Sequence, residues 1–242
     1  MTQTGTNILP TPDNALTLSQ LVGGGTEWHT TVFLTNLSST PEGYTIRFYD
    51  DSGQATLMPI ETLGLVDSLS GTLGAGETRR YETGADATLH AAWALLTPTT
   101  AATVRLAGFA VFRHTVPSGN STVSSEGVVD LTGVSDAKYV LLYDNFQGPV
   151  TTAVFANPDA FNPVTVQADI RDEQGALLAT DSITLPPLGH TAFVLTDRFP
   201  ATIARQGSIR FSSLKSFTGL GLRFSPFGTF TSFRLLTSKD IQ

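Results

Sequence analysis

The feature that most constrains the fold of this chain is an internal repeat. The segment Thr30-Thr31-Val32-Phe33-Leu34-Thr35-Asn36 returns as Thr151-Thr152-Ala153-Val154-Phe155-Ala156-Asn157. Each copy continues through a strand-like stretch into an acidic turn, first Asp50-Asp51-Ser52-Gly53 and then Asp172-Glu173-Gln174-Gly175. The offset between the copies is the size of one domain and is too long for a solenoid repeat. The repeat therefore predicts a duplicated domain whose recurring residues serve the fold.

The pattern between the turns is that of short β-strands. Tyr44 to Tyr49 alternates apolar and polar residues and stops at the turn that ends in Gly53. Similar short stretches, separated by Gly, Pro and Asn turn signals, follow along the whole chain, with almost no helical periodicity. Leu89 to Leu96 is the one ambiguous stretch, and its β context favours a strand. We expect at most one or two helical turns.

These observations predict an all-β protein. It consists of two tandem antiparallel β-sandwich domains, immunoglobulin-like or jelly-roll-like, related by internal duplication. The expected boundaries are an extended N-terminal arm at 1–15, a first sandwich at 16–132 and a second at 137–238.

A family resemblance rests on three motifs. They are the repeated Thr-Thr segment that ends in Asn36 and Asn157, the stretch Arg47-Phe48-Tyr49-Asp50-Asp51-Ser52-Gly53, and Gly219-Leu220-Gly221-Leu222-Arg223-Phe224 followed by Gly228-Thr229-Phe230-Thr231-Ser232-Phe233. In these the chain resembles tandem β-sandwich repeats of uncharacterised exported or surface proteins of soil-type bacteria, over roughly residues 16–238. The resemblance implies a fold and a location outside the cell, and it implies no catalytic residue.

Composition narrows the classes of partner. Only 14% of residues are charged, the net charge is −7, and the 14 Lys and Arg residues are scattered singly. Phosphate backbones require clustered cations, so we expect no nucleic-acid partner. Threonine, serine and glycine take the place of charges, as in many secreted β proteins.

The chain has no cysteine, so it forms no disulfide and offers no thiolate chemistry. No apolar run approaches the ~20 residues of a membrane span, and we expect no membrane insertion. The start, Met1-Thr2-Gln3-Thr4-Gly5-Thr6, is not a signal peptide. The chain is then either cytosolic or a mature exported chain with an added methionine, and composition favours the second.

Candidate metal and catalytic residues are sparse. Asp50, Asp51, Asp172 and Glu173 are weak Ca²⁺ candidates, because each turn offers only two carboxylates without the alternating spacing of a loop site. Turn chemistry explains their duplication better. The histidines at 29, 90, 114 and 190 share no ligand spacing, and no Gly-x-Ser-x-Gly elbow exists. We expect no catalytic residue, no cofactor and no enzymatic activity.

Aromatic residues are the remaining candidates for ligand binding. Trp28, Trp93, Tyr49 and Tyr81 are weak candidates for a sugar-binding platform, since Trp and Tyr carry polar edges. The phenylalanines from 211 to 233 are interpreted as the core of the second domain. The N-terminal arm can join subunits by adding a strand to a sheet edge, although a disordered leader is the simpler alternative.

The sequence thus favours a non-catalytic extracellular structural or adhesive module. We expect it to associate with itself or with another surface protein through sheet edges or the N-terminal arm. Self-association of this kind would build a filament or a surface layer. The alternative is a carbohydrate-binding module of a secreted protein, with a polysaccharide as partner. A dispersed active site between the domains is the least favoured hypothesis.

Overall fold

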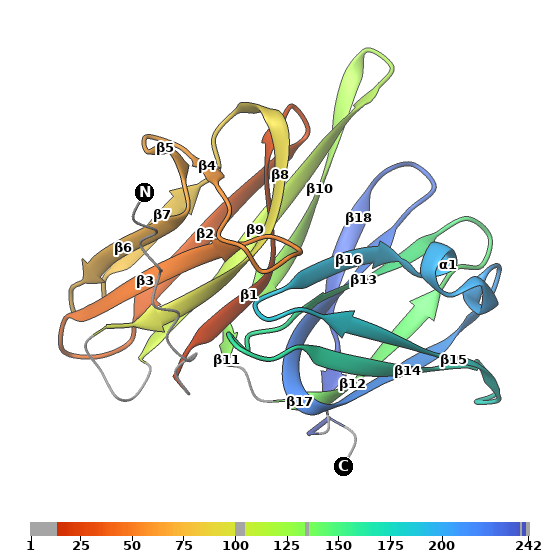
Figure 1. The fold of residues 1–242 in the computed structure, drawn as a ribbon. Coiled ribbons are helices and arrows are strands. Elements are labelled where there is room, and N and C mark those ends of the chain that lie inside the picture. The colour runs from red at the N-terminus through yellow and green to blue at the C-terminus, as the bar shows by residue number, and fades with distance from the viewer. Residues whose placement is uncertain (1–13, 100–104, 134–135, 238, 241–242) are drawn as a thin grey trace, which may run out of the picture.

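The computed structural model describes residues 14–99, 105–133, 136–237 and 239–240, and most of the expected N-terminal arm lies outside them. The described part is nearly all β, with antiparallel sheets (Figure 1). Its helical elements are the single turn α1 (Leu195–Arg198) and the 3-10 turn η1 (Pro200–Thr202). The expectation of an all-β chain with one or two helical turns is confirmed.

The first half of the chain holds eleven strands, nine of which pair into one antiparallel sheet. Strand β2 pairs with β7, β9 and β1, and β9 pairs with β10. Strands β1, β8, β3 and β6 pair in that order, with β11 added to β1. Strands β4 and β5 form a separate hairpin. The bounds are β1 (Leu16–Gly25), β2 (Trp28–Asn36), β3 (Glu42–Tyr49), β4 (Met58–Ile60), β5 (Gly64–Val66), β6 (Ser68–Leu73), β7 (Thr78–Glu82), β8 (Asp86–Pro98), β9 (Leu106–Ser118), β10 (Ser121–Asp130) and β11 (Thr132–Gly133).

The second half uses a matching set of pairings. Strand β13 pairs with β16 and β17, and β17 pairs with β18. Strands β12, β17, β14 and β15 pair in that order, with β19 added to β12. The bounds are β12 (Asp136–Asp144), β13 (Val150–Ala156), β14 (Val164–Asp172), β15 (Leu177–Leu185), β16 (His190–Val194), β17 (Gln206–Phe224), β18 (Phe230–Arg234) and β19 (Leu236–Thr237).

Strand β17 pairs with two different groups of strands in the second half. Residues 206–212 pair with β12 and β14, whereas residues 218–224 pair with β13 and β18. Sequence patterning predicts two strands here, 207–213 and 217–224. The chain passes from one group of partners to the other within a single strand, and the fully exposed Leu214 lies between the two groups. In the first half, two separate strands make the corresponding pairings: β8 pairs with β1 and β3, and β9 pairs with β2 and β10.

The two halves share apolar core. Val154, Leu220, Leu222 and Phe230 of the second half belong to the main core of the first half, where Phe230 stacks on Phe112 with ring centroids 5.3 Å apart. The second half keeps its own core around Phe155, Phe211 and Phe217. The interpretation of the C-terminal phenylalanines as core of the second half holds for Phe211 and Phe217. It fails for Phe230, which packs on the first half, and for Phe227, which is 87% exposed in a turn.

The edges of the two halves also meet side by side. Strands β10 and β18 are joined through serine side chains, because the Ser232 hydroxyl accepts from the Val128 amide at 2.6 Å and the Phe230 amide donates to Ser125 Oγ at 3.1 Å. Two edges that would otherwise be open thus cover one another. The ambiguous stretch from Leu89 to Leu96 lies inside β8 and is a strand, as expected.

Candidate functional site

The two acidic turns are built alike. The Asp50 Oδ1 atom accepts from the backbone amides of Ser52 and Gln54, both at 2.9 Å, and the Asp50 carbonyl accepts from Gly53. Asp172 Oδ1 accepts from the amides of Gln174 and Ala176, at 3.1 and 2.8 Å. The repeated aspartate therefore satisfies backbone donors of its own hairpin turn, as the sequence suggests. An oxygen used in this way is a poorer ligand for Ca²⁺.

The second residue of each turn has a different environment. Asp51 reaches across to the second half, where its Oδ1 lies 2.7 Å from Nδ1 of the buried His190. This hydrogen bond holds the pKa of Asp51 below its ordinary value. The other ring nitrogen, Nε2, lies 3.1 Å from Oε1 of Gln20 on β1. Glu173 only accepts from its neighbour Gln174. The first acidic turn is therefore part of the contact between the halves.

Two asparagines anchor equivalent turns. Asn36 Nδ2 donates to the carbonyls of Thr40, Leu73 and Gly74, and Asn157 Nδ2 donates to those of Asn162, Leu185 and Pro186. Each Oδ1 accepts from the amide two residues later. Both asparagine side chains are buried, and their amide groups satisfy backbone carbonyls of which those of Leu73 and Leu185 are buried as well. The asparagines at the ends of the repeated segments thus have a structural role.

The expected sugar platform does not assemble. Trp93 is completely buried, stacks on Tyr49 and donates through Nε1 to the Leu188 carbonyl of the second half at 2.8 Å. Neither Trp93 nor Tyr49 has a ring face available to a sugar. Trp28 is half-buried and stacks on His114 at 4.2 Å. The four candidates are therefore distributed between the core and the contact between the halves.

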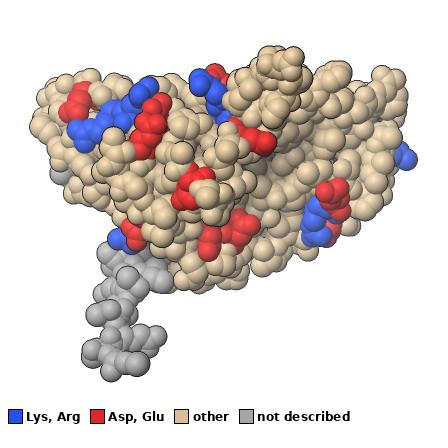
Figure 2. Space-filling model, turned by 90° about the horizontal axis from the view of Figure 1, so that it is seen from above, with Lys and Arg blue, Asp and Glu red and all other residues tan. Residues whose placement is uncertain are grey.

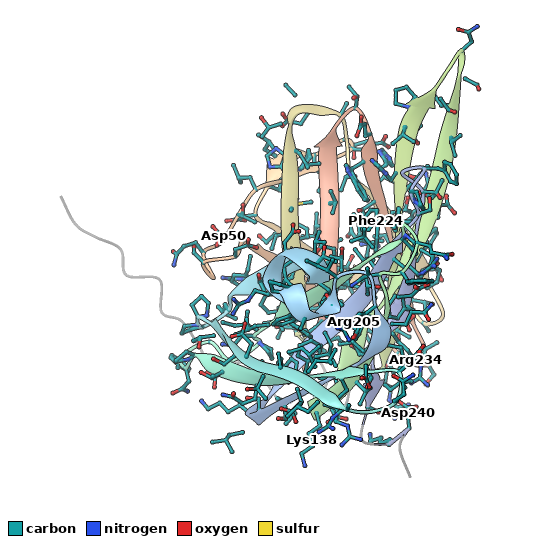
Figure 3. All side chains as sticks on the ribbon, turned by 90° about the vertical axis from the view of Figure 1, so that its right-hand side faces the viewer. Asp50, Lys138, Arg205, Phe224, Arg234 and Asp240 are labelled. Atoms are coloured by element: carbon teal, nitrogen blue, oxygen red, sulfur yellow. The ribbon has the colours of Figure 1, made fainter. Side chains whose placement is uncertain are left out.

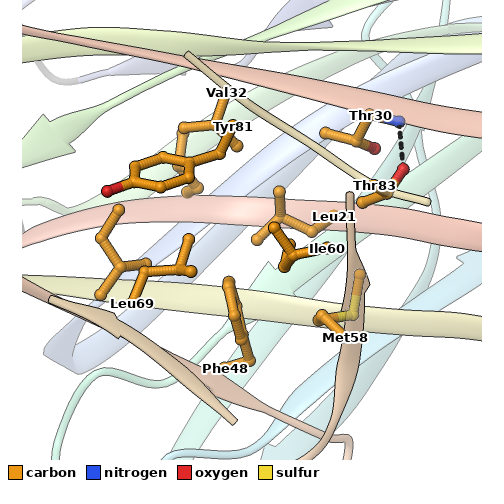
Figure 4. Close-up of a pocket in the computed structure, with 11 residues that line it drawn as sticks. Leu21, Thr30, Val32, Phe48, Met58, Ile60, Leu69, Tyr81 and Thr83 are labelled. Atoms are coloured by element: carbon orange, nitrogen blue, oxygen red, sulfur yellow. Dashed lines mark hydrogen bonds between the residues drawn. The ribbon is translucent and has the colours of Figure 1, made fainter. Parts of the chain in front are cut away.

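Tyr81 lies at the edge of a small internal void in the first half (Figure 4). Its hydroxyl forms a hydrogen bond with the Tyr44 hydroxyl at 2.5 Å. Burial is the main cause of the raised pKa of Tyr44, and this hydrogen bond raises that pKa further. Phe48, Met58 and Leu69 line the void, whose volume of about 10 Å³ is close to that of one water-sized sphere. Such a void is a packing defect of the core and is too small for an organic ligand.

The remaining histidines each lie near at least one carboxylate, and one of them, His29, lies near two. His90 and His114 are each 3.3 Å from one carboxylate, Asp86 and Glu27 respectively. His29 lies on β2, with Glu61 and Glu82 so placed that one ligand atom from each residue lies within 4.8 Å of the others. Sequence reasoning missed this group because its members come from three elements whose spacing along the chain carries no signal.

An open pocket of about 240 Å³ lies at the second acidic turn, between Phe146, Asp172, Glu173 and Arg205. Elsewhere many arginines lie beside a carboxylate, for example Arg234, which bonds Asp240 at 2.8 Å (Figure 3). On the face shown in Figure 2 the charged residues are few, and positive groups mostly sit next to negative ones. Opposite charges are therefore paired locally on this face instead of forming a large patch of one sign.

A pair of phenylalanines lies on the outward face of the β2–β9 sheet. Phe33 and Phe109 are cross-strand partners with ring centroids 5.0 Å apart, and Phe109 is 40% exposed. Sequence reasoning did not select them, since alternation along each strand alone does not reveal which two rings become neighbours.

No family model and no curated protein sequence matches this chain. Among solved structures, a β-glucuronidase from glycoside hydrolase family 2 is matched at 8% identity and a TM-score of 0.17, over 87% of this chain and 24% of that one. The chain therefore spans about a quarter of that enzyme, and so low a score carries no argument about fold or activity. Within the described residues, no helix has the length and apolar character needed to cross a membrane.

Proposed function

We propose that this chain is a non-catalytic structural or adhesive module that acts outside the cell and consists of two tandem β-sandwich domains derived by duplication. The strand partners support the duplication. The pairs β2–β7, β2–β9 and β3–β6 correspond to β13–β16, β13–β17 and β14–β15. The repeated asparagines and turn aspartates make the same local hydrogen bonds in both halves. The proposed boundary lies between 132 and 137; β11 ends at Gly133 and β12 begins at Asp136.

The observation that carries a contact function is a pair of edge strands. Among the described residues, β6 pairs only with β3, and β15 pairs only with β14. β6 has no charged residue, and the nine residues of β15 include one, Asp181. Weakly charged edge strands of this kind are templates for strand addition by another chain. Self-association through these edges is the contact that we propose, with another surface protein as the alternative partner.

Each edge carries an arginine that occupies an outward carbonyl. Arg79 donates to the Thr72 carbonyl at 3.1 Å, and Arg198 donates to the Ser182 carbonyl at 2.8 Å. In an antiparallel edge strand, alternate residues direct both backbone groups away from the sheet. Thr180 therefore shares the outward direction of Ser182. The arginines are side-chain caps that must swing aside before another strand can pair.

Self-association is tested by light scattering and negative-stain microscopy of the full chain at micromolar concentration. Arg198→Ala uncovers the β15 edge and should increase the mass of the particles. Thr180→Pro removes an outward amide without disturbing the β14 ladder, and it should reduce association, whereas Thr180→Val retains the amide and is the control. A parent and an Arg198→Ala variant that both remain monomeric would contradict the proposal.

Carbohydrate binding is the second candidate, and the Phe33–Phe109 pair favours it. Two neighbouring rings on a sheet face can pack on the apolar face of a sugar, with Arg80 and Arg113 nearby on β7 and β9. A polysaccharide pull-down distinguishes this function, because Phe109→Ala should abolish retention. Leu214→Ala removes another exposed apolar side chain and should leave retention unchanged.

A further inference from the structure

One group of side chains has the composition of a metal site. His29 lies on β2, Glu82 ends β7, and Glu61 follows β4, so three separate elements contribute. One ligand atom from each residue lies within 4.8 Å of the other two. Three ligands of this kind are the number that zinc sites with an open position use.

The backbone fixes the positions of the three residues. Thr31 is the cross-strand partner of Glu82, and since side chains alternate along a strand, His29 lies on the same outward face. The Glu61 amide donates to the Glu82 carbonyl at 2.8 Å, which ties the turn after β4 to the end of β7. The group therefore does not depend on a long loop.

The charges of the group are only partly balanced. The Glu82 carboxylate accepts from Thr31 Oγ1 at 3.2 Å and from Arg80 at 3.1 Å, which fixes its orientation. Among the described residues, neither the Glu61 carboxylate nor the His29 imidazole has a side-chain hydrogen-bond or ion-pair partner. Arg80 thus bonds Glu82 and, within the described part of the chain, leaves the Glu61 carboxylate unpaired, while Arg113, the cross-strand partner of His29, bonds Glu126. Both His29 and Glu61 can therefore bind a cation.

The fold does not require these residue types. At the equivalent positions of the second half, Val150 precedes the repeated Thr-Thr pair as His29 does, and Val194 faces Thr152 as Glu82 faces Thr31. Valine meets the demands of the same strand positions. The imidazole and the carboxylate are therefore additions to the first half that strand pairing alone does not explain.

We propose that His29, Glu61 and Glu82 bind a divalent transition-metal ion, of which Zn²⁺ is the best match. An imidazole nitrogen suits zinc, whereas Ca²⁺ and Mg²⁺ prefer oxygen ligands alone. Zinc bonds of about 2.0–2.2 Å at tetrahedral angles place ligand atoms about 3.4 Å apart. Side-chain movements of about one ångström therefore bring the three ligand atoms to bonding distance of the ion, and a water molecule takes the fourth coordination position.

The test is calorimetric titration of the untagged, EDTA-treated full chain with Zn²⁺, with Mg²⁺ as the comparison ion. We expect one Zn²⁺ ion per chain and a higher melting temperature with Zn²⁺ alone. His29→Ala and Glu61→Gln should each weaken binding at least tenfold. Asp169→Asn changes an exposed carboxylate of the second half and should leave binding unchanged.

Two further readouts keep a folding defect apart from a lost ligand. The melting temperatures of His29→Ala and Glu61→Gln in EDTA should match that of the parent chain. Co²⁺ bound to the parent should give the intense visible absorption of a four-coordinate site, and Glu61→Gln should lose it. The proposal is overturned if the parent shows no saturable Zn²⁺ binding, or if the variant that combines His29→Ala with Glu61→Gln binds Zn²⁺ as the parent does.

Discussion

The two turn glycines offer a matched pair of substitutions. Gly53 and Gly175 occupy the same place in the two acidic turns, with φ of +82° and +83°. A Cβ atom on Gly175 meets nothing within 4 Å, whereas a Cβ atom on Gly53 overlaps the carbonyl oxygen of Pro187 in the second half. Replacing each glycine by alanine therefore imposes the same backbone strain, and only one replacement disturbs the contact between the halves.

The expected magnitudes differ for that reason. Alanine in the left-handed region costs about 1 kcal/mol relative to glycine, so Gly175→Ala should lower the free energy of unfolding by about that amount. In Gly53→Ala the turn must also move away from Pro187 by more than an ångström. That shift breaks the Asp51–His190 hydrogen bond, one to a charged group worth about 1.5–3 kcal/mol. We expect a total of about 2.5–4 kcal/mol for Gly53→Ala.

The assay is thermal and urea unfolding of both variants and the parent. For a chain of this size, the difference of about 1.5–3 kcal/mol between the variants corresponds to about 3–12 °C in melting temperature. Tryptophan fluorescence reports the contact directly, because Trp93 lies in the buried layer between the halves. Equal losses of stability in Gly53→Ala and Gly175→Ala would refute the reasoning, since the turn would then contribute nothing beyond its own conformation.

Three further predictions follow from the contacts described above. Asn157→Ala leaves the carbonyls of Asn162, Leu185 and Pro186 without their shared donor and should cost about 1–3 kcal/mol in urea unfolding, whereas a substitution at the exposed Leu214 should cost almost nothing. Trp93→Phe removes the donor to the Leu188 carbonyl and part of the buried ring, and should lower the melting temperature by several degrees; an unchanged temperature would mean that the halves are not held together there. The folded pKa of Asp51 lies below its ordinary value of 3.8, so its contribution to stability is present above about pH 4 and is lost as the pH falls through the folded pKa. Urea unfolding of Asp51→Asn should therefore show a weaker loss of stability below pH 4 than the parent, and identical acid profiles would contradict the assignment.

Local features of the chain were readable from its sequence. Period-two alternation and frequent turn residues predict strands, because a strand presents alternate side chains to opposite faces whatever its neighbours are. The repeated Asn36 and Asn157 each bond the amide two residues later but also carbonyls of distant parts of the chain, which the repeat alone does not reveal. The repeated aspartates predict hairpin turns, since each side chain bonds backbone amides two and four residues further along. Such contacts form between residues that are close in the sequence, so the sequence alone predicts them.

Contacts between distant parts of the chain were decided by the tertiary structure. Nothing in the sequence distinguishes Gly53, which is pressed against Pro187, from Gly175, which faces open space. Phe230 joins the core of the other half, and Trp93 becomes a buried donor where an exposed ring was expected. The group of His29, Glu61 and Glu82 forms because β2, β7 and the turn after β4 come together. Apolar burial is non-directional, so the sequence determines which side chains must be buried, whereas only the docking of the two halves decides against what.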